Sequence, residues 1–311
     1  MKKVVIAVSN ISNINPEAKS RLESAGFSVE EYADTLLLSQ KELISLLHQA
    51  DAVIAGLESY PEEVLTSLPS LKLIARRGVG VDNIDMEAAK SLGITVTRTE
   101  GLVGIAVAEL VMGYLLEHSR MLSLHNTEMK NNTWNRHLAE GVNGKTLGLV
   151  GFGSIAREVA VRANAFGMKV VCYYRHRDTA IEKEYAVQYI DFKTLINTSD
   201  YISINVPLTY ETTGMFHREI FQKMKNTAVI INTARSKIIN TVDLVNALQN
   251  QEIGGAYIDV FDNEPYHDGE LMSCDNAFLT PHIGTFTKST FQAMNSRCID
   301  QVIEFFNVQG K

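Results

Sequence analysis

Residues 148–156, GLVGFGSIA, constrain the fold of this chain more than any other segment. The apolar run 145–150 predicts a buried strand, and apolar residues at helical spacing over 154–166 predict a helix. Two glycines lie between them. A strand, a Gly-x-Gly turn and a helix start together predict the phosphate-binding corner of a dinucleotide-binding fold; a tight turn without a ligand is the alternative.

Each residue of this turn has an expected part. Gly151 permits the tight turn, and Gly153 lets a pyrophosphate approach the backbone. Ser154 and Ile155 open the helix, whose N-terminus presents free N–H groups and a partial positive charge. Ala156 stands where a third glycine is usual, and the motif tolerates it. We therefore predict that a cofactor binds at Gly151, Gly153, Ser154 and Ile155.

The composition fits an ordinary globular protein of two domains, since the chain has 311 residues. Its net charge of −7 argues against nucleic acid or an anionic membrane as the main partner. The cysteines Cys172, Cys274 and Cys298 form neither a disulfide framework nor a metal-ligand pattern, so we expect a reducing cytoplasm and no metal. No apolar run predicts a signal peptide or a membrane span.

Strand and helix patterns alternate along the chain in two separate runs. The first run predicts strands at 3–8, 27–31, 52–55, 73–75 and 94–97, with helices at 16–25, 41–48, 61–68 and 85–92. A long helix is expected at 104–119, followed by a polar, weakly periodic segment at 126–143. The pattern restarts at 145, and a last helix is expected at 286–306. Two separate runs of this alternating pattern favour two parallel sheets over one large doubly wound sheet.

The second run predicts six strands, each followed by a short connection or a helix. These strands are expected at 145–150, 169–173, 201–205, 228–232, 256–259 and 277–280. Because the carboxyl ends of parallel strands meet at one edge of a sheet, residues that follow these strands are the candidates for ligand binding.

Seven motifs occur in order along the chain: RRGVGVDNID (76–85), VAE (107–109), GKTLGLVGFGSIA (144–156), VPLT (206–209), INTARS (231–236), DVFDNEP (259–265) and TPHIGT (280–285). Together they resemble the D-isomer-specific 2-hydroxyacid dehydrogenases, most closely the phosphoglycerate-dehydrogenase-like branch. The resemblance implies an α/β fold of two doubly wound parallel-sheet domains. A Rossmann nucleotide-binding domain (99–285) would be inserted in a flavodoxin-like substrate domain (1–98 plus 286–311). It also implies a homodimer, with 126–143 in the dimerisation arm.

Three side chains supply what the reduction of a 2-keto acid requires. Arg235 follows the strand 228–232, and its planar guanidinium matches a carboxylate. His282 follows the strand 277–280 and suits proton exchange at neutral pH. Glu264 follows the strand 256–259 and is placed to orient the imidazole. The resemblance implies the same roles: substrate binding for Arg235, acid–base catalysis for His282, and support of the histidine for Glu264.

The resemblance implies further contacts around this catalytic set. The loop Gly78, Val79 and Gly80 would bind the substrate carboxylate through its backbone N–H groups. Asp259 would accept a hydrogen bond from the nicotinamide amide. The remaining cofactor-binding positions are Val206, Pro207, Thr233, Ala234 and Gly284.

The residues after the second nucleotide-domain strand predict the choice of cofactor. NAD-specific folds place an acidic residue there, about 20 residues past the glycines, to hold the ribose 2′-hydroxyl. Tyr174 occupies that position here, and Arg175 and Arg177 follow it. A guanidinium binds a 2′-phosphate that a carboxylate would repel. NADP(H) is therefore favoured over NAD(H), with Tyr174, Arg175 and Arg177 at the adenosine ribose.

Two function classes remain open from the sequence. The first is an oxidoreductase that transfers a hydride between NAD(P)(H) and a small D-2-hydroxy acid or 2-keto acid, either 3-phosphoglycerate or glyoxylate and hydroxypyruvate. The second is a nucleotide-sensing, corepressor-like binding protein, because a fold alone does not fix a function. The complete set of Arg235, Glu264 and His282 favours the enzyme.

Overall fold

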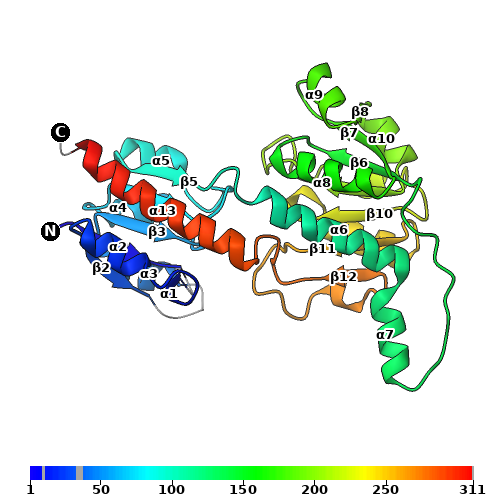
Figure 1. Ribbon diagram of the computed structural model, residues 1–311, viewed down its shortest axis with the longest axis horizontal. Helices are drawn as coiled ribbons and strands as arrows, with labels where there is room; N and C mark the ends of the chain where they lie inside the picture. Colours follow the sequence, from blue (N-terminus) through cyan, green and yellow to red (C-terminus); the bar gives the residue numbers. More distant parts are fainter. Residues whose placement is uncertain (9–10, 33–37, 310–311) are drawn as a thin grey trace. The chain divides into compact units, whose positions relative to one another are not determined.

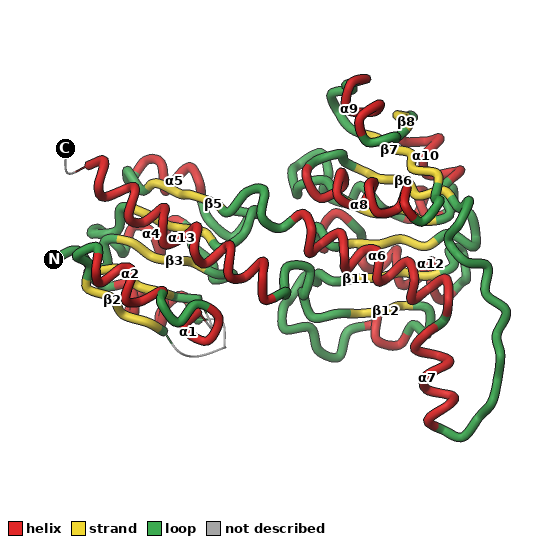
Figure 2. Tube along the Cα trace, viewed as in Figure 1, coloured by secondary structure: helices red, strands yellow, loops and turns green. Residues whose placement is uncertain are grey.

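Two compact units make up the computed structural model, which describes residues 1–8, 11–32 and 38–309. The first unit combines Met1–Val103 with Phe286–Lys311, and the second is Gly104–Thr285. The crossing at 103/104 therefore lies a few residues after the expected 98/99. All paired strands are parallel, and helices alternate with strands (Figure 2). This confirms the predicted α/β class with two doubly wound parallel sheets.

The first unit contains a five-stranded sheet in the spatial order β2-β1-β3-β4-β5. Its strands are β1 (Lys3–Ile6), β2 (Ser28–Glu31), β3 (Ala52–Ala55), β4 (Leu73–Arg76) and β5 (Thr95–Arg98). Its helices are α1 (Ile11–Ile14), α2 (Ala18–Ser24), α3 (Gln40–Leu47), α4 (Glu62–Thr66), α5 (Met86–Ser91) and α13 (Lys288–Gln309). The C-terminal helix α13 thus returns to the unit that contains the N-terminus (Figure 1).

The second unit contains a seven-stranded sheet in the order β12-β11-β10-β9-β6-β7-β8. Its strands are β6 (Thr146–Val150), β7 (Lys169–Tyr173), β8 (Gln188–Tyr189), β9 (Tyr201–Ile204), β10 (Val229–Asn232), β11 (Gly255–Ile258) and β12 (Ala277–Leu279). Its α-helices are α6 (Gly104–Arg120), α7 (Leu122–Lys130), α8 (Ser154–Ala165), α9 (Thr179–Glu184), α10 (Phe192–Thr198), α11 (Arg218–Phe221) and α12 (Thr241–Gln249). Two 3-10 helices, η1 (Ser236–Ile238) and η2 (Glu270–Ser273), lie in its connections.

Polar side chains fix where several helices begin. Ser39 and Glu42 form a capping box at the start of α3. Asp85, Asp191 and Asn240 each accept a hydrogen bond from a first-turn backbone N–H of the helix that follows. These caps satisfy donors that have no partner inside the helix, and so they set the helix boundaries.

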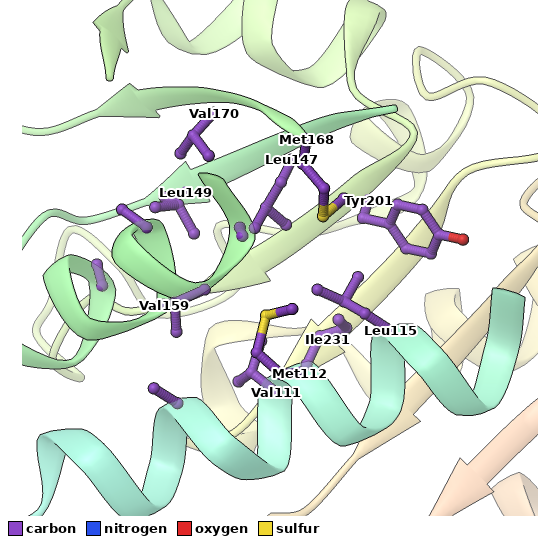
Figure 3. Packing of buried hydrophobic residues seen from close by; sticks show 14 of the residues in the cluster. Val111, Met112, Leu115, Leu147, Leu149, Val159, Met168, Val170, Tyr201 and Ile231 are labelled. Carbon is purple, nitrogen blue, oxygen red and sulfur yellow. The ribbon is translucent and has the colours of Figure 1, made fainter. Parts of the chain in front are cut away.

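The cores lie between the sheets and the helices on their faces. In the second unit, Val111, Met112 and Leu115 of α6 point toward the sheet, where Leu147 and Ile231 belong to the same buried cluster (Figure 3). A separate cluster fills the other face beneath α10, α11 and α12. Because both faces of the central strands are buried, these strands read as continuous apolar runs.

The helices expected at 218–224 and 241–249 correspond to α11 and α12, and apart from the two 3-10 helices four elements of the second unit are absent from the predicted pattern: α7, α9, α10 and β8. Helix α7 has no buried residue, so it carries no apolar periodicity to detect. Together with the segment that follows, it projects from its unit (Figure 1). Helices α9 and α10 are short, and their only sequence signals are the caps Asp178 and Asp191.

Candidate active site

The three proposed catalytic residues follow three neighbouring strands. Arg235 comes after β10, Glu264 after β11 and His282 after β12, and these strands pair in parallel. Their carboxyl ends therefore lie side by side at one edge of the sheet, where open α/β sheets bind ligands. The fold of this unit alone brings the three side chains to that edge.

His282 and Glu264 form a hydrogen-bonded pair. His282 Nδ1 lies 2.7 Å from Glu264 Oε2, and Glu264 Oε1 accepts a hydrogen bond from the backbone N–H of Phe261 at 3.0 Å. Because an ionised carboxylate only accepts, it selects the imidazole tautomer with the proton on Nδ1. The second ring nitrogen, Nε2, is then the one that exchanges a proton with a ligand.

Opposing effects set the charge of Glu264. Burial raises the pKa of the Glu264 carboxyl, but the hydrogen bond and charge of His282, the Phe261 N–H and the charge of Arg235 bring it below its ordinary value. The side chain is therefore a carboxylate at neutral pH. It stabilises an imidazolium on His282 and so supports a histidine that gives and takes a proton.

The Glu264→Gln variant tests this charge. The amide keeps the size of the side chain but has no negative charge, so we expect kcat of reduction to fall about 10-fold. The pH optimum of reduction should move to lower pH, because the imidazolium loses its anionic partner. Glu270→Gln, at an exposed position of the same β11–β12 connection, is the matched control. An unchanged pH profile in Glu264→Gln would remove Glu264 from the pair.

The turn that carries Arg235 is held by a buried amide. Asn232, 1% exposed, accepts a hydrogen bond from Ala234 N at 3.0 Å and donates to Arg235 O at 2.9 Å. Arg235 Nη1 donates to Ala234 O at 2.7 Å. Thr233 and Ala234, both half-buried, lie in the same turn. The arrangement fits the predicted carboxylate-binding arginine.

Asp259 makes hydrogen bonds within the protein, besides the contact with the nicotinamide amide that the sequence leads us to expect. Its carboxylate is 1% exposed and accepts hydrogen bonds from Thr280 Oγ1, Ile283 N and Gly284 N at 2.5, 2.8 and 2.8 Å. Burial raises its pKa, and these donors only partly offset that effect. Asp259 thus organises the turn that contains His282, and Thr280 is a site residue that received no role from the sequence.

The glycine turn after β6 fits a dinucleotide phosphate. A Cβ on Gly151 would lie 2.6 Å from Asn205 O, and φ of Gly151 is +92°, so only glycine suits this position. Val206, after β9, packs against the same glycine. A Cβ at Gly153 would meet no atom within 4 Å, and Gly153 gives α8 no side-chain cap. The first-turn N–H groups of α8, from Ser154 and Ile155 onward, are therefore available to an anion.

The strand order places this turn at a switch point of the sheet. The chain runs from β6 outward through β7 to β8, and then returns to place β9 on the other side of β6. Ligands of doubly wound sheets bind at such points. Pro207 follows Val206 in the connection after β9, and Thr212 Oγ1 donates to Pro207 O at 2.7 Å. The expected cofactor positions after β6, β9 and β10 therefore occupy one edge of the sheet.

The two predicted arginines after β7 have different surroundings. Arg175 is 73% exposed, and its Nη2 lies 3.9 Å from Glu211 Oε1. Arg177 donates from Nε and Nη2 to Glu182 at 2.7 and 3.2 Å and lies over the ring of Tyr189. Tyr174 is tied by its hydroxyl to the backbone of Asp178. Arg175 is therefore the better placed of the two for a 2′-phosphate, since Arg177 donates two hydrogen bonds to Glu182 whereas Arg175 is more exposed and only approaches Glu211 at 3.9 Å.

The glycine loop expected to bind substrate lies in the other unit, after β4. Gly78 has φ of +145°, and its N–H donates to Thr99 Oγ1 at 2.9 Å. Among the described residues, Val79 and Gly80 have no backbone N–H partner. Any carboxylate contact of this loop therefore falls to Val79 and Gly80 rather than to Gly78.

The described residues also bear on two other kinds of site, metal centres and membrane spans. Across 1–8, 11–32 and 38–309, no three His, Cys, Asp or Glu side chains are grouped to hold a metal ion. Over the same residues, no helix has the length and apolar character needed to cross a bilayer.

Known proteins resemble this chain over nearly its whole length. The family model "D-isomer specific 2-hydroxyacid dehydrogenase, NAD binding domain" matches residues 112–284. A glyoxylate reductase of Thermococcus litoralis is 36% identical over 93% of this chain and 91% of its own. A hydroxypyruvate reductase of Thermotoga maritima is 36% identical over 86% and 88%. The crystal structure of the TT0316 protein of Thermus thermophilus superposes with a TM-score of 0.87, at 34% identity over 96% and 94%.

The fold, the strand-end residues and these matches first define a class, the oxidoreductases with a domain for a nicotinamide cofactor. Within that class, the chain belongs to the D-isomer-specific 2-hydroxyacid dehydrogenases. The predicted family and reaction are thereby confirmed: hydride transfer between a nicotinamide cofactor and a D-2-hydroxy acid or its 2-keto acid.

Proposed function

We propose that this dehydrogenase reduces glyoxylate and hydroxypyruvate and prefers NADPH to NADH. The observation that carries the proposal is the 2.7 Å pair of His282 and Glu264, with Arg235 close enough to influence the charge of Glu264. Two relatives whose names describe reduction of these two keto acids, each 36% identical to this chain, support the choice of substrate.

The three side chains divide the tasks of the reduction among them. Arg235 binds the carboxylate of the keto acid through paired, charge-assisted hydrogen bonds and polarises the neighbouring carbonyl. The bound dihydronicotinamide supplies the hydride. His282 gives its Nε2 proton to the carbonyl oxygen as that oxygen gains negative charge, and the imidazole is left neutral. Glu264 orients the ring and favours its protonated form before the transfer. Solvent then reprotonates His282.

The surroundings of Arg76 support a small, unphosphorylated acid over 3-phosphoglycerate. Arg76 precedes the Gly78 loop, but its side chain is 5% exposed and donates to the carbonyl of Arg77. Its guanidinium lies directly beneath Gly78, where a Cβ would be 2.9 Å from Nη1. A buried guanidinium engaged with the backbone is poorly placed for the phosphate of a longer substrate.

The absence of a carboxylate at Tyr174 and the exposure of Arg175 support NADPH as the preferred cofactor. Gly151, Gly153, Ser154 and Ile155 would hold the pyrophosphate.

A homodimer in the cytoplasm is part of the same proposal. The segment after α6 carries apolar side chains with no cover in one chain: Trp134 is 78% exposed and Leu138 98%. Leu122, Leu124 and Met129 of α7 are exposed as well, and apolar side chains gathered on one stretch of surface are typical of an interface. The three cysteines are free and buried, which suits a reducing compartment.

The test is a steady-state assay of glyoxylate, hydroxypyruvate, pyruvate and 3-phosphohydroxypyruvate, each with NADPH and with NADH. We expect kcat/KM to be highest for the first two acids with NADPH, because relatives 36% identical to this chain are named for reducing them and because the buried Arg76 is poorly placed for a phosphate. Preference for 3-phosphohydroxypyruvate would contradict the proposed substrate. Tight cofactor binding with no turnover of any acid would favour a nucleotide sensor.

A further inference from the structure

A chain of buried hydroxyls connects helix α6 to the turn that carries His282. Tyr114 of α6 is 2% exposed, and its hydroxyl contacts Thr280 Oγ1. Thr280 Oγ1 in turn donates to Asp259 Oδ1 at 2.5 Å. Tyr114 precedes Thr280 by 166 positions. None of the proposed catalytic steps uses Tyr114, and it lies outside every sequence motif that indicates the family.

The direction of donation along this chain follows from the chemistry of its members. Asp259 accepts a hydrogen bond from Thr280 Oγ1 and two more from backbone N–H groups. The single proton of Thr280 is then used, and Thr280 Oγ1 must accept from Tyr114. Burial raises the pKa of the Tyr114 phenol above its usual value, so Tyr114 keeps its proton for donation. Hydrogen bonds arranged in one direction strengthen one another.

Asp259 passes this support on to the catalytic turn. Its Oδ1 and Oδ2 accept from Ile283 N and Gly284 N, each at 2.8 Å. These are the two residues directly after His282, which has φ of +53°. A left-handed backbone is unfavourable for a residue with a side chain, so the surrounding contacts must hold it. The two amide bonds to Asp259 are such contacts.

The geometry points to Tyr114 as a positioning residue for the reaction: its hydroxyl, acting through Thr280 and Asp259, holds the 282–284 turn so that the His282 ring stays against Glu264. This inference rests on the proposed acid–base role of His282. It adds a buried residue of α6 that acts through Thr280 and Asp259.

A matched control separates the hydroxyl from the ring. Tyr114 packs against Tyr257 and Phe278, with ring centroids 5.2 and 6.0 Å away, and phenylalanine retains these contacts. Tyr257 lies in the same aromatic cluster and is buried. Its hydroxyl has no hydrogen bond among the described residues, so Tyr257→Phe makes the same chemical change without breaking the chain of hydroxyls.

The first measurement is hydrogen–deuterium exchange of the full-length protein without ligands, followed in peptides that cover 281–285. Tyr114→Phe should speed exchange of the Ile283 and Gly284 amides by about 5- to 30-fold, the effect expected for weakening a buried hydrogen bond. Tyr257→Phe should leave it unchanged. Equal exchange in the two variants would overturn the inference.

The second measurement is kinetic. We expect Tyr114→Phe to lower kcat of keto-acid reduction by about 5- to 30-fold, with KM for the acid and Kd for the cofactor within about 2-fold of wild type. Thr280→Val should lower kcat at least as much, and adding Tyr114→Phe to it should change little, because the relay is already broken. Thr280→Ser, which keeps the hydroxyl group, should retain most of the wild-type activity.

The outcomes distinguish this inference from the proposed function. Faster exchange with unchanged kcat would make Tyr114 a structural contact only and would overturn the positioning role. Additive losses in the double variant would also overturn it. If wild type reduces no 2-keto acid, the proposed function fails, while the exchange measurement still decides whether Tyr114 holds the turn.

Discussion

Replacing His282 with glutamine is expected to lower kcat of keto-acid reduction by about 10²- to 10⁴-fold, with Kd for the cofactor nearly unchanged. Glutamine retains a polar group near Glu264 but has no proton to give at neutral pH. Since His282 has a left-handed backbone with φ of +53°, His282→Asn is the better-tolerated second variant, because asparagine adopts this region more readily. Kinetics of both variants at saturating cofactor give the measurement.

A matched control for this loss is His267→Gln, an exposed histidine in the same β11–β12 connection. It should retain wild-type kcat. Turnover of His282→Gln and His282→Asn near the wild-type value would contradict the acid–base role, whereas weak cofactor binding in both would indicate a disordered turn instead.

The second large effect concerns the cofactor. Arg175→Ala is expected to lower the ratio of kcat/KM for NADPH to that for NADH by about 10- to 100-fold, the cost of losing a charge-assisted contact to the 2′-phosphate. The loss should appear mainly in KM for NADPH. Parallel initial-rate measurements with both cofactors provide the ratio.

Arg177→Ala is the comparison for this experiment. Because Arg177 already donates two hydrogen bonds to Glu182, its removal should change the ratio less than removal of Arg175. Wild-type preference for NADH, or an unchanged ratio in Arg175→Ala, would contradict the assigned contact.

Much of the fold follows from local patterns in the sequence. The strands after which Arg235, Glu264 and His282 lie are short apolar runs, and parallel pairing necessarily gathers their ends. Gly151 could be predicted because its backbone conformation and the close approach of Asn205 O admit only glycine. Helix α7 could not be predicted in this way, because all its side chains are at least partly exposed and give no apolar periodicity.

The site was predictable where a role depends on residue type and strand position, and less so where it depends on distant partners. The periodicity of α6 places Tyr114 on the buried face with Val111 and Leu115, but a helix pattern does not reveal a hydroxyl partner on another strand end. The engagement of Arg177 depends similarly on Glu182 in the unpredicted helix α9. Such pairs follow from the tertiary fold rather than from local sequence.

The most direct test of the central claim is reduction of hydroxypyruvate with NADPH that carries two deuterium atoms at nicotinamide C4, followed by NMR and chiral analysis of the product. If His282, Glu264 and Arg235 act as proposed, the product is D-glycerate with one deuterium at C2, and His282→Gln forms it at least about 100-fold more slowly. L-glycerate, a product without deuterium at C2, or cofactor binding without any turnover would contradict the account.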